Sequence, residues 1–150
     1  MKNKKRGFTL LEVLIVIGII AILSSVALVA VNPARQFKLA RDAQRMSNVS
    51  AIVNAVSQNM SENQGILVCR GNQTMLPSTS TPIKFPGGFD LATCIVPDYI
   101  SVVPFDPSLP GAHFATTTDY DTGYVIYQDS RGRITASSTG EINPSITAVR

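Results

Sequence analysis

Histidine and cysteine are scarce in this chain of 150 residues, which contains one histidine and two cysteines. The histidine, His113, has no partner nucleophile at the spacing of a recognisable catalytic motif, so we do not expect it to act in catalysis. No set of Cys and His residues has metal-ligand spacing, and no phosphate-binding loop or dinucleotide fingerprint occurs. An enzyme is therefore the least favoured class of function.

Charge is absent over nineteen consecutive residues, from Val13 to Val31. At helical rise this run is about 28 Å long, close to the thickness of a bilayer core. Four cations precede it: Lys2, Lys4, Lys5 and Arg6. They predict a cytoplasmic N-terminus and place the residues beyond Val31 across the membrane. A secretory signal would place its small residue after the apolar run, whereas Gly7 precedes it, so cleavage at Gly7 would leave the helix on the product.

One carboxylate, Glu12, lies directly before this uncharged run and within the expected membrane helix of residues 8–31. A charged side chain at the centre of a membrane helix costs about 2.5–3.5 kcal/mol, so by default it has a functional partner. The α-amino group that cleavage would create at Phe8 is one candidate, and the helix dipole also favours an anion at this end. Pairing within one chain is possible, because one helical turn separates the two residues. The alternative is a Glu12 that stays hydrated near the membrane surface.

The run Arg6-Gly7-Phe8-Thr9-Leu10-Leu11-Glu12 resembles the processing motif of type IV prepilins and the related pseudopilins. In that family a membrane-embedded aspartic peptidase cuts after the glycine and methylates the new amino terminus. The resemblance implies cleavage between Gly7 and Phe8 and N-methylation of Phe8. It also implies that Glu12 pairs with the Phe8 amine of a neighbouring subunit, which neutralises both charges and sets the axial register.

The family implies an α+β fold, in which a long N-terminal helix packs against a small antiparallel β-sheet. The membrane half of this helix is followed by an amphipathic half. We expect four segments: a cleaved basic leader, a membrane and filament-core helix, an amphipathic helix half and a small β-rich globular domain, at residues 1–7, 8–31, 32–64 and 65–150.

The net charge of +3 and the isoelectric point near 9.1 depend on the leader. Without residues 1–7 the chain has nine Lys and Arg against ten Asp and Glu. Residues 35–45 carry four cations and one acid, whereas residues 46–150 carry five cations and eight acids. This asymmetry predicts a basic collar beside the membrane and a mildly acidic outer domain, with no nucleic-acid surface.

The helical pattern is interrupted at Asn32-Pro33, where we expect a kink or an unwound segment. It resumes from Ala34 to about Asn63 and ends at Gly65. Apolar residues then recur at steps of three and four, which predicts one packing stripe: Leu39, Ala43, Met46, Val49, Val53, Val56 and Met60. The charged side chains are expected to point mainly in other directions: Arg35, Lys38, Arg41, Arg45 and Glu62.

The clearest strand signal is a hairpin of residues 123–128 and 133–138, joined by a turn at 129–132. Residues 99–103 have a β-branched and aromatic composition. The following Pro104-Phe105-Asp106-Pro107 is similar to a Pro-Lys-Asp-Pro turn of pseudopilins and simpler pilins. We expect a polar loop over Pro77–Pro86, continuing irregularly through Gly87-Gly88, and an irregular tail over Gly140–Arg150.

Two further pairs of residues are candidate sites. Cys69 and Cys94 would lie on the outer side of the membrane, where a disulfide is the natural interpretation and two free thiols the alternative. Asp119 and Asp121 precede Gly123 but lack the spacing of an EF-hand. Some pseudopilins bind calcium before their last strands, so a calcium site at these two residues stays open beside a plain solvated turn. His113 is expected in a nearby loop.

These observations predict a structural subunit of a type IV pilus. Its partners would be copies of itself, other pilins, the prepilin peptidase, and an assembly platform with a cytoplasmic ATPase. The precursor would span the cytoplasmic membrane once, before assembly into an extracellular pilus or a periplasmic pseudopilus. One alternative is a type II secretion pseudopilin, and a second is a minor pilin that binds DNA or a surface.

Overall fold

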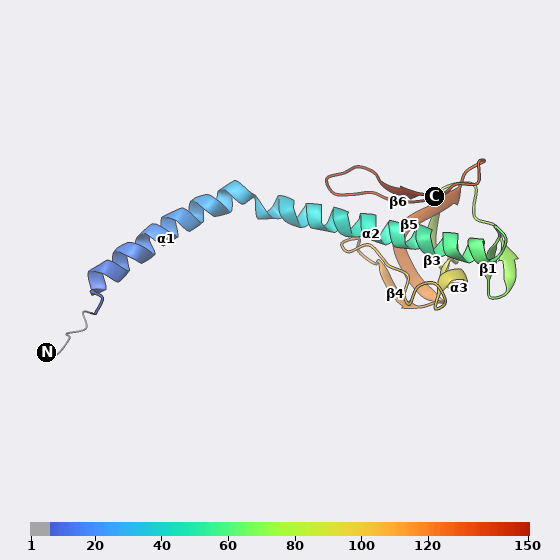
Figure 1. Cartoon of the computed structure of the whole chain (residues 1–150), viewed down its shortest axis with the longest axis horizontal. Coiled ribbons are helices and arrows are strands. Elements are labelled where there is room, and N and C mark those ends of the chain that lie inside the picture. The colour runs from blue at the N-terminus through green and yellow to red at the C-terminus, as the bar shows by residue number, and fades with distance from the viewer. Residues whose placement is uncertain (1–6) are drawn as a thin grey trace. The chain divides into compact units, whose positions relative to one another are not determined.

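The computed structural model describes residues 7–150, and the expected leader residues before Gly7 lie outside this range (Figure 1). The chain divides into two units, Met1–Phe37 and Lys38–Arg150. The first unit contains helix α1, Leu10–Val31, and the first turn of helix α2, Pro33–Glu62. The second contains the rest of α2, a short helix α3 (Ala92–Ile95) and all the strands.

Helix α1 ends at Val31 and is capped by Asn32, which adopts a left-handed conformation with φ 46°. Asparagine tolerates this conformation because its short polar side chain can bond locally. Its Oδ1 accepts a hydrogen bond from the Arg35 amide at 3.3 Å. Proline follows at the first position of α2, where its fixed φ suits a helix start and its missing N–H removes no internal bond. The predicted interruption at Asn32-Pro33 is confirmed.

Helix α2 ends as the sequence predicts. The amide of Gly65 donates to the Met60 carbonyl at 2.7 Å, and Gly65 has φ 88°. A positive φ after the last turn is the usual place for glycine in a helix C-cap.

The buried face of α2 differs from the predicted stripe in its first half. Val49, Val53 and Val56 are buried as expected, but Met46 is 45% exposed and Ala43 is exposed. Polar side chains occupy the buried positions there: Asp42, Arg45 and Asn48. The prediction that Arg45 points away from the packing face is therefore wrong, because carboxylates of the second unit compensate its charge.

The main sheet is antiparallel, with the order β3-β5-β6-β7. Figure 1 labels its strands β3, β5 and β6. Its strands are β3 (Thr81–Phe85), β5 (Asp119–Gln128), β6 (Ile134–Ser138) and β7 (Ile146–Val149); β4 (His113–Thr116) pairs with the start of β5. The predicted hairpin is confirmed by β5 and β6, with Gln128 opposite Ile134. A separate hairpin joins β1 (Leu67–Cys69) to β2 (Asn72–Thr74).

Several expectations for this unit are wrong. Residues 81–85 form β3 and not a polar loop, and Ile83 is fully buried. Pro82 is compatible with β3 because this strand lies at the end of the β3-β5-β6-β7 order, where a missing donor is tolerated. Residues 146–149 form β7 and not an irregular tail. His113 begins β4 instead of lying in a loop, and residues 99–103 form no strand despite their β-branched and aromatic composition.

The core of the second unit lies between α2 and the main sheet. It contains Val49, Ile52 and Val56 from the helix, together with Tyr120, Tyr124 and Ile126 from β5, all nearly inaccessible to solvent. Alternate residues of β5 are buried, which is the pattern of a strand with one face on a core. Burial of this apolar surface supplies the main stabilisation of the unit.

Candidate processing and assembly site

The segment that would be processed lies just before α1. Gly7, Phe8 and Thr9 are outside the helix, and Phe8 is 83% exposed. Thr9 is extended, with φ −82° and ψ 151°, and it forms the N-cap of α1. The bond between Gly7 and Phe8 therefore lies in an exposed, non-helical stretch of chain.

Glu12 lies in the first turn of α1, and its amide donates to the Thr9 hydroxyl oxygen at 3.2 Å. Thr-x-x-Glu is the spacing of a capping box, in which the threonine and the glutamate together satisfy free amides at a helix start. This capping role of Thr9 was not predicted above, although the Thr9-Leu10-Leu11-Glu12 spacing indicates it. Glu12 makes no ion pair with any residue of the range 7–150.

Helix α1 has the length and composition of a membrane span, and no residue of it is buried. Its 22 residues extend about 33 Å, which matches a hydrocarbon core of ~30 Å. An apolar helix without an aqueous-facing polar side needs lipid or other apolar helices around it. The length, composition and exposure of α1 therefore fit a membrane-anchored precursor.

A buried ionic cluster joins α2 to two loops of the second unit. Nε of Arg45 donates to Oδ2 of Asp106 at 2.6 Å, and Nη2 donates to Oδ1 at 2.9 Å. Both side chains are about 4% exposed. The hydrogen bonds to Asp106 raise the pKa of Arg45 further above its ordinary value. Burial opposes ionisation of Asp106, but Arg45 and the amides of Ser108 and Leu109 lower its pKa overall.

Asp42, one turn before Arg45, holds the loop that leads to β7. Its carboxylate accepts hydrogen bonds from the amides of Glu141, Ile142 and Asn143 at 2.8, 2.9 and 3.0 Å. The backbone bonds from Asn143 and Glu141 are the main reason that the pKa of Asp42 lies well below its ordinary range. Successive amides that converge on one oxygen pair form an anion-binding nest, which is occupied here by a side chain of the same chain.

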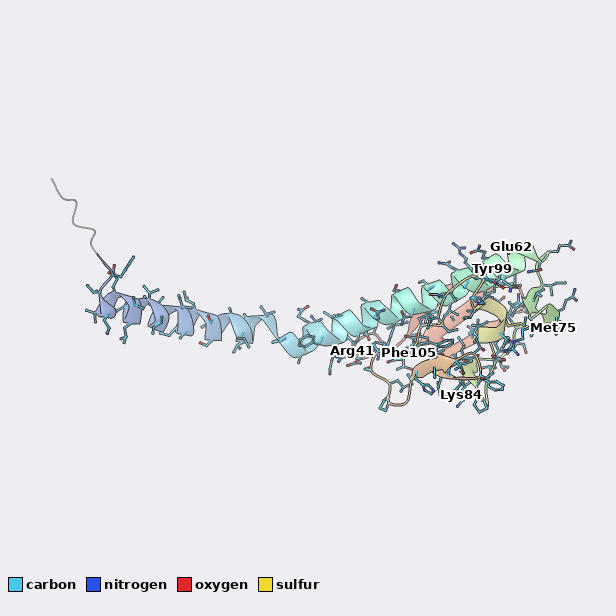
Figure 2. The ribbon with its side chains drawn as sticks, turned by 90° about the horizontal axis from the view of Figure 1, so that it is seen from below. Arg41, Glu62, Met75, Lys84, Tyr99 and Phe105 are labelled. Atoms are coloured by element: carbon cyan, nitrogen blue, oxygen red, sulfur yellow. A yellow bond between two sulfur atoms is a disulfide. The ribbon has the colours of Figure 1, made fainter. Side chains whose placement is uncertain are left out.

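Arg41 and Glu141 extend the cluster towards solvent. Nε of Arg41 donates to Oε1 of Glu141 at 2.5 Å, and Nη2 donates to Oε2 at 2.7 Å. This pairing is the main cause that lowers the pKa of Glu141 to about 2. Figure 2 labels Arg41 on α2 and Phe105, the residue that precedes Asp106.

The ionic cluster corrects the predicted basic collar. Of its four cations, Arg41 and Arg45 are paired with carboxylates inside the second unit. Arg35 and Lys38 are exposed and form no ion pair with residues 7–150. The collar is therefore half as large as the sequence indicated.

Cys69 and Cys94 form a disulfide, so the alternative of two free thiols is not what the structure contains. The bond joins β1 to α3, two elements that also share Asn59 of α2. The Nδ2 group of Asn59 donates to the carbonyls of Val68 and Cys94 at 2.8 and 2.7 Å. The disulfide and this asparagine together hold the end of the unit that lies beside the last turns of α2.

Asp119 and Asp121 lie two residues apart on β5 and not in a solvated turn. Oδ1 of Asp119 contacts Nε2 of His113 at 3.2 Å, and Oδ2 of Asp121 lies 3.9 Å from Lys84 Nζ. Within residues 7–150 no group of three His, Cys, Asp or Glu side chains could hold a metal ion. Calcium binding at these two aspartates stays a prediction.

The first part of the sequence matches a known family model. Residues 2–28 match the prokaryotic N-terminal methylation motif, which is the signal of type IV prepilins and pseudopilins. No curated protein and no solved structure matches the chain. The chain thus carries the type IV prepilin and pseudopilin signal, and its long apolar helix followed by a helix and a small antiparallel sheet is a pilin-like α+β fold.

Proposed function

We propose that this protein is a structural subunit of a type IV pilus, cut after Gly7, N-methylated at Phe8 and assembled through α1. The observation that carries the proposal is the match of residues 2–28 to the methylation motif, together with an apolar α1 that has no buried residue. In this proposal the membrane surrounds α1 before assembly, and α1 helices of neighbouring subunits surround it in the filament.

In the assembly step, the Phe8 amine of one subunit would pair with the Glu12 carboxylate of a neighbouring subunit. Cleavage creates an amine on Phe8, and Glu12 has no cation of its own within residues 7–150. Moving an unpaired carboxylate into an apolar filament core is unfavourable, so contact with the amine of a neighbouring subunit would favour one axial position. Apolar contacts along α1 would supply most of the remaining stabilisation.

A short periplasmic pseudopilus is the second candidate, favoured by Asp106-Pro107, which is similar to a pseudopilin turn. In this chain Asp106 also forms a structural ion pair with Arg45. The turn alone therefore does not distinguish a pseudopilin from a pilin. The expected partners are the same in both candidates: other pilins, the prepilin peptidase, and an assembly platform with its ATPase.

Mass spectrometry of sheared surface filaments from the native host tests the proposal. We expect the major component to begin with methylated Phe8. If the processed chain occurs only in the membrane fraction, the pilus assignment is wrong and the pseudopilus or a minor pilin replaces it. An intact Met1 end in host membranes would contradict processing itself.

The variant Glu12→Gln tests the pairing step, because it removes the charge and keeps the length of the side chain. We expect normal membrane insertion and cleavage but a loss of filaments. Asp98→Asn, at an exposed carboxylate of the second unit, is the matched control and should assemble normally. Normal filament yield from Glu12→Gln would rule out the charge pair.

A further inference from the structure

The first turns of α2 carry two cations and one aromatic side chain that are exposed within the described residues 7–150. Arg35 and Lys38 are exposed, and Phe37, between them in sequence, is 65% exposed. The other two cations of the segment, Arg41 and Arg45, donate to Glu141 and Asp106. Within residues 7–150, Arg35 and Lys38 have no carboxylate partner, whereas Arg41 and Arg45 have one, which indicates a role for the first two outside the folded contacts of this range.

The position of these residues along the chain identifies the surroundings. The last residue of α1 is Val31, and Arg35 follows four residues later. At about 1.5 Å per residue, Arg35 and Lys38 lie within roughly 10 Å of the end of the apolar span. This distance is comparable to the headgroup layer that adds ~5–8 Å to each side of the hydrocarbon core.

The side chains fit that layer. Arginine and lysine extend their apolar stems along lipid and keep the charge at the headgroups, and aromatic side chains are enriched at membrane surfaces. Within the headgroup layer, lipid surrounds a single helix on all sides. Arg35, Phe37 and Lys38 can therefore all contact lipid without sharing one face of α2. The segment is also continuous with α1, which already lies in the membrane.

We propose that Arg35, Phe37 and Lys38 form an interfacial anchor that binds anionic phospholipid headgroups in the outer leaflet of the cytoplasmic membrane. The two cations complement the negative charge of the lipid phosphate, and Phe37 enters the boundary between headgroups and acyl chains. The proposal rests on the membrane-anchored precursor and does not need a filament. The membrane-anchored subunit would then bind anionic lipid preferentially, and it would have to leave this lipid before it enters a filament.

Fluorescence quenching can measure this preference, because the chain has no tryptophan. The full chain with Phe37→Trp is reconstituted into vesicles of phosphatidylcholine and phosphatidylglycerol, with bromine on the acyl chains of one lipid at a time. The ratio of quenching by the two brominated lipids gives the relative binding of the anionic lipid beside residue 37.

We expect the anionic lipid to be preferred several-fold at low salt. Arg35→Gln/Lys38→Gln in the Phe37→Trp background should remove this preference and bring the quenching ratio close to one. Salt at about 1 M, where the Debye length is ~3 Å, should have a similar effect. Arg70→Gln/Arg131→Gln is the matched control, since both side chains are exposed on the second unit and form no ion pair within residues 7–150.

A quenching ratio near one, or a ratio that Arg35→Gln/Lys38→Gln leaves unchanged, would overturn the proposal. If the same variant lowers filament yield while the ratio is unchanged, the cations contact carboxylates of another subunit instead of lipid. The vesicles contain only the protein and lipid, so the quenching ratio does not depend on filament assembly. Failure of the anchor and failure of the pilus assignment therefore give separate results.

Discussion

Arg45 on α2 and Asp106 in the loop before β4 form a two-bond ion pair that is almost inaccessible to solvent. The pair fixes the loop to the first half of α2, where the buried positions are polar instead of apolar. Ser108 and Leu109 donate their amides to the same carboxylate at 2.9 Å, so Asp106 also determines the path of the chain that follows.

Removing one partner of this pair should strongly destabilise the second unit. Asp106→Ala leaves the Arg45 charge buried with only part of its compensation, and loss of one member of a buried pair costs about 3–5 kcal/mol. Urea unfolding of the detergent-solubilised full chain, followed by the near-ultraviolet circular dichroism of its tyrosines, measures the change.

The double variant Arg45→Met/Asp106→Leu is the informative control, because it removes both charges and keeps apolar volume. We expect it to recover much of the stability lost by Asp106→Ala. A double variant as unstable as the single one would show that the hydrogen bonds to Ser108 and Leu109, and not the buried charge, dominate the effect.

Asp42 should control the loop before β7 in a more local way. Asp42→Ala removes the acceptor of three amides, at Glu141, Ile142 and Asn143. We expect these amides to lose their protection from hydrogen exchange, while the amides of β5 and β6 keep most of theirs. Unchanged exchange at all three positions would contradict the assignment of Asp42 as their main acceptor.

Acid should weaken the same cluster. The pKa values of Asp42, Asp106 and Glu141 are all lowered in the folded chain, so the folded state binds fewer protons than the unfolded state. Their contribution is complete above the ordinary carboxyl range and is lost progressively as the pH falls. For Glu141 this loss runs from about 4.5 down to about 2, its ordinary and its folded pKa.

The free energy of unfolding, measured from pH 7 down to pH 2, tests this direction. Glu141→Gln should flatten part of the decline. His113, whose pKa is raised by the Gly111 carbonyl and by Asp119, acts in the opposite direction above pH 6.5 and does not overlap this window. Stability that rises on acidification below pH 4.5 would contradict the ionic cluster.

The sequence predicts the parts of this fold that depend on local signals. The uncharged run predicts α1, Asn32-Pro33 predicts the interruption, and Gly65 predicts the end of α2. The β5–β6 hairpin follows from the aromatic and β-branched residues of β5 and the β-branched Ile134 and Thr135 of β6, on either side of a polar turn. In each case neighbouring residues decide the structure without help from distant ones.

The missed elements depend on contacts between distant residues. Arg45 is indistinguishable from a solvent-facing arginine until Asp106, 61 positions later, lies beside it. Strand β3 contains a proline and only five residues, and its pairing with β5 outweighs that local signal. Strand β7 is short and forms because β6 offers it an edge.

The disulfide should stabilise the second unit measurably. Cys69 and Cys94 are 25 residues apart, and closing a loop of this length stabilises by about 3 kcal/mol in the chain-entropy model. Cys69→Ser/Cys94→Ser should therefore unfold at lower urea, and reductant should lower the stability of the parent chain alone. Equal stability of the two proteins without reductant would contradict this contribution.

Thr9 should stabilise the first turn of α1 independently of filament assembly. Thr9→Val keeps the shape of the side chain and removes the oxygen that accepts the Glu12 amide, and loss of an N-cap costs about 1 kcal/mol. We expect the Glu12 amide to exchange about fivefold faster in micelles of the full chain, with Thr9→Ser as the variant that retains protection. Unchanged exchange in Thr9→Val would mean that Thr9 is not the cap.

This measurement also separates the two roles of Glu12. A glutamine can replace glutamate in a capping box, so Glu12→Gln should keep the first turn protected although it carries no charge. If its filaments are lost while the first turn is intact, the charge acts between subunits. If both are lost, Glu12 supports assembly by holding the start of its own helix, and the intersubunit pair is not needed to explain the defect.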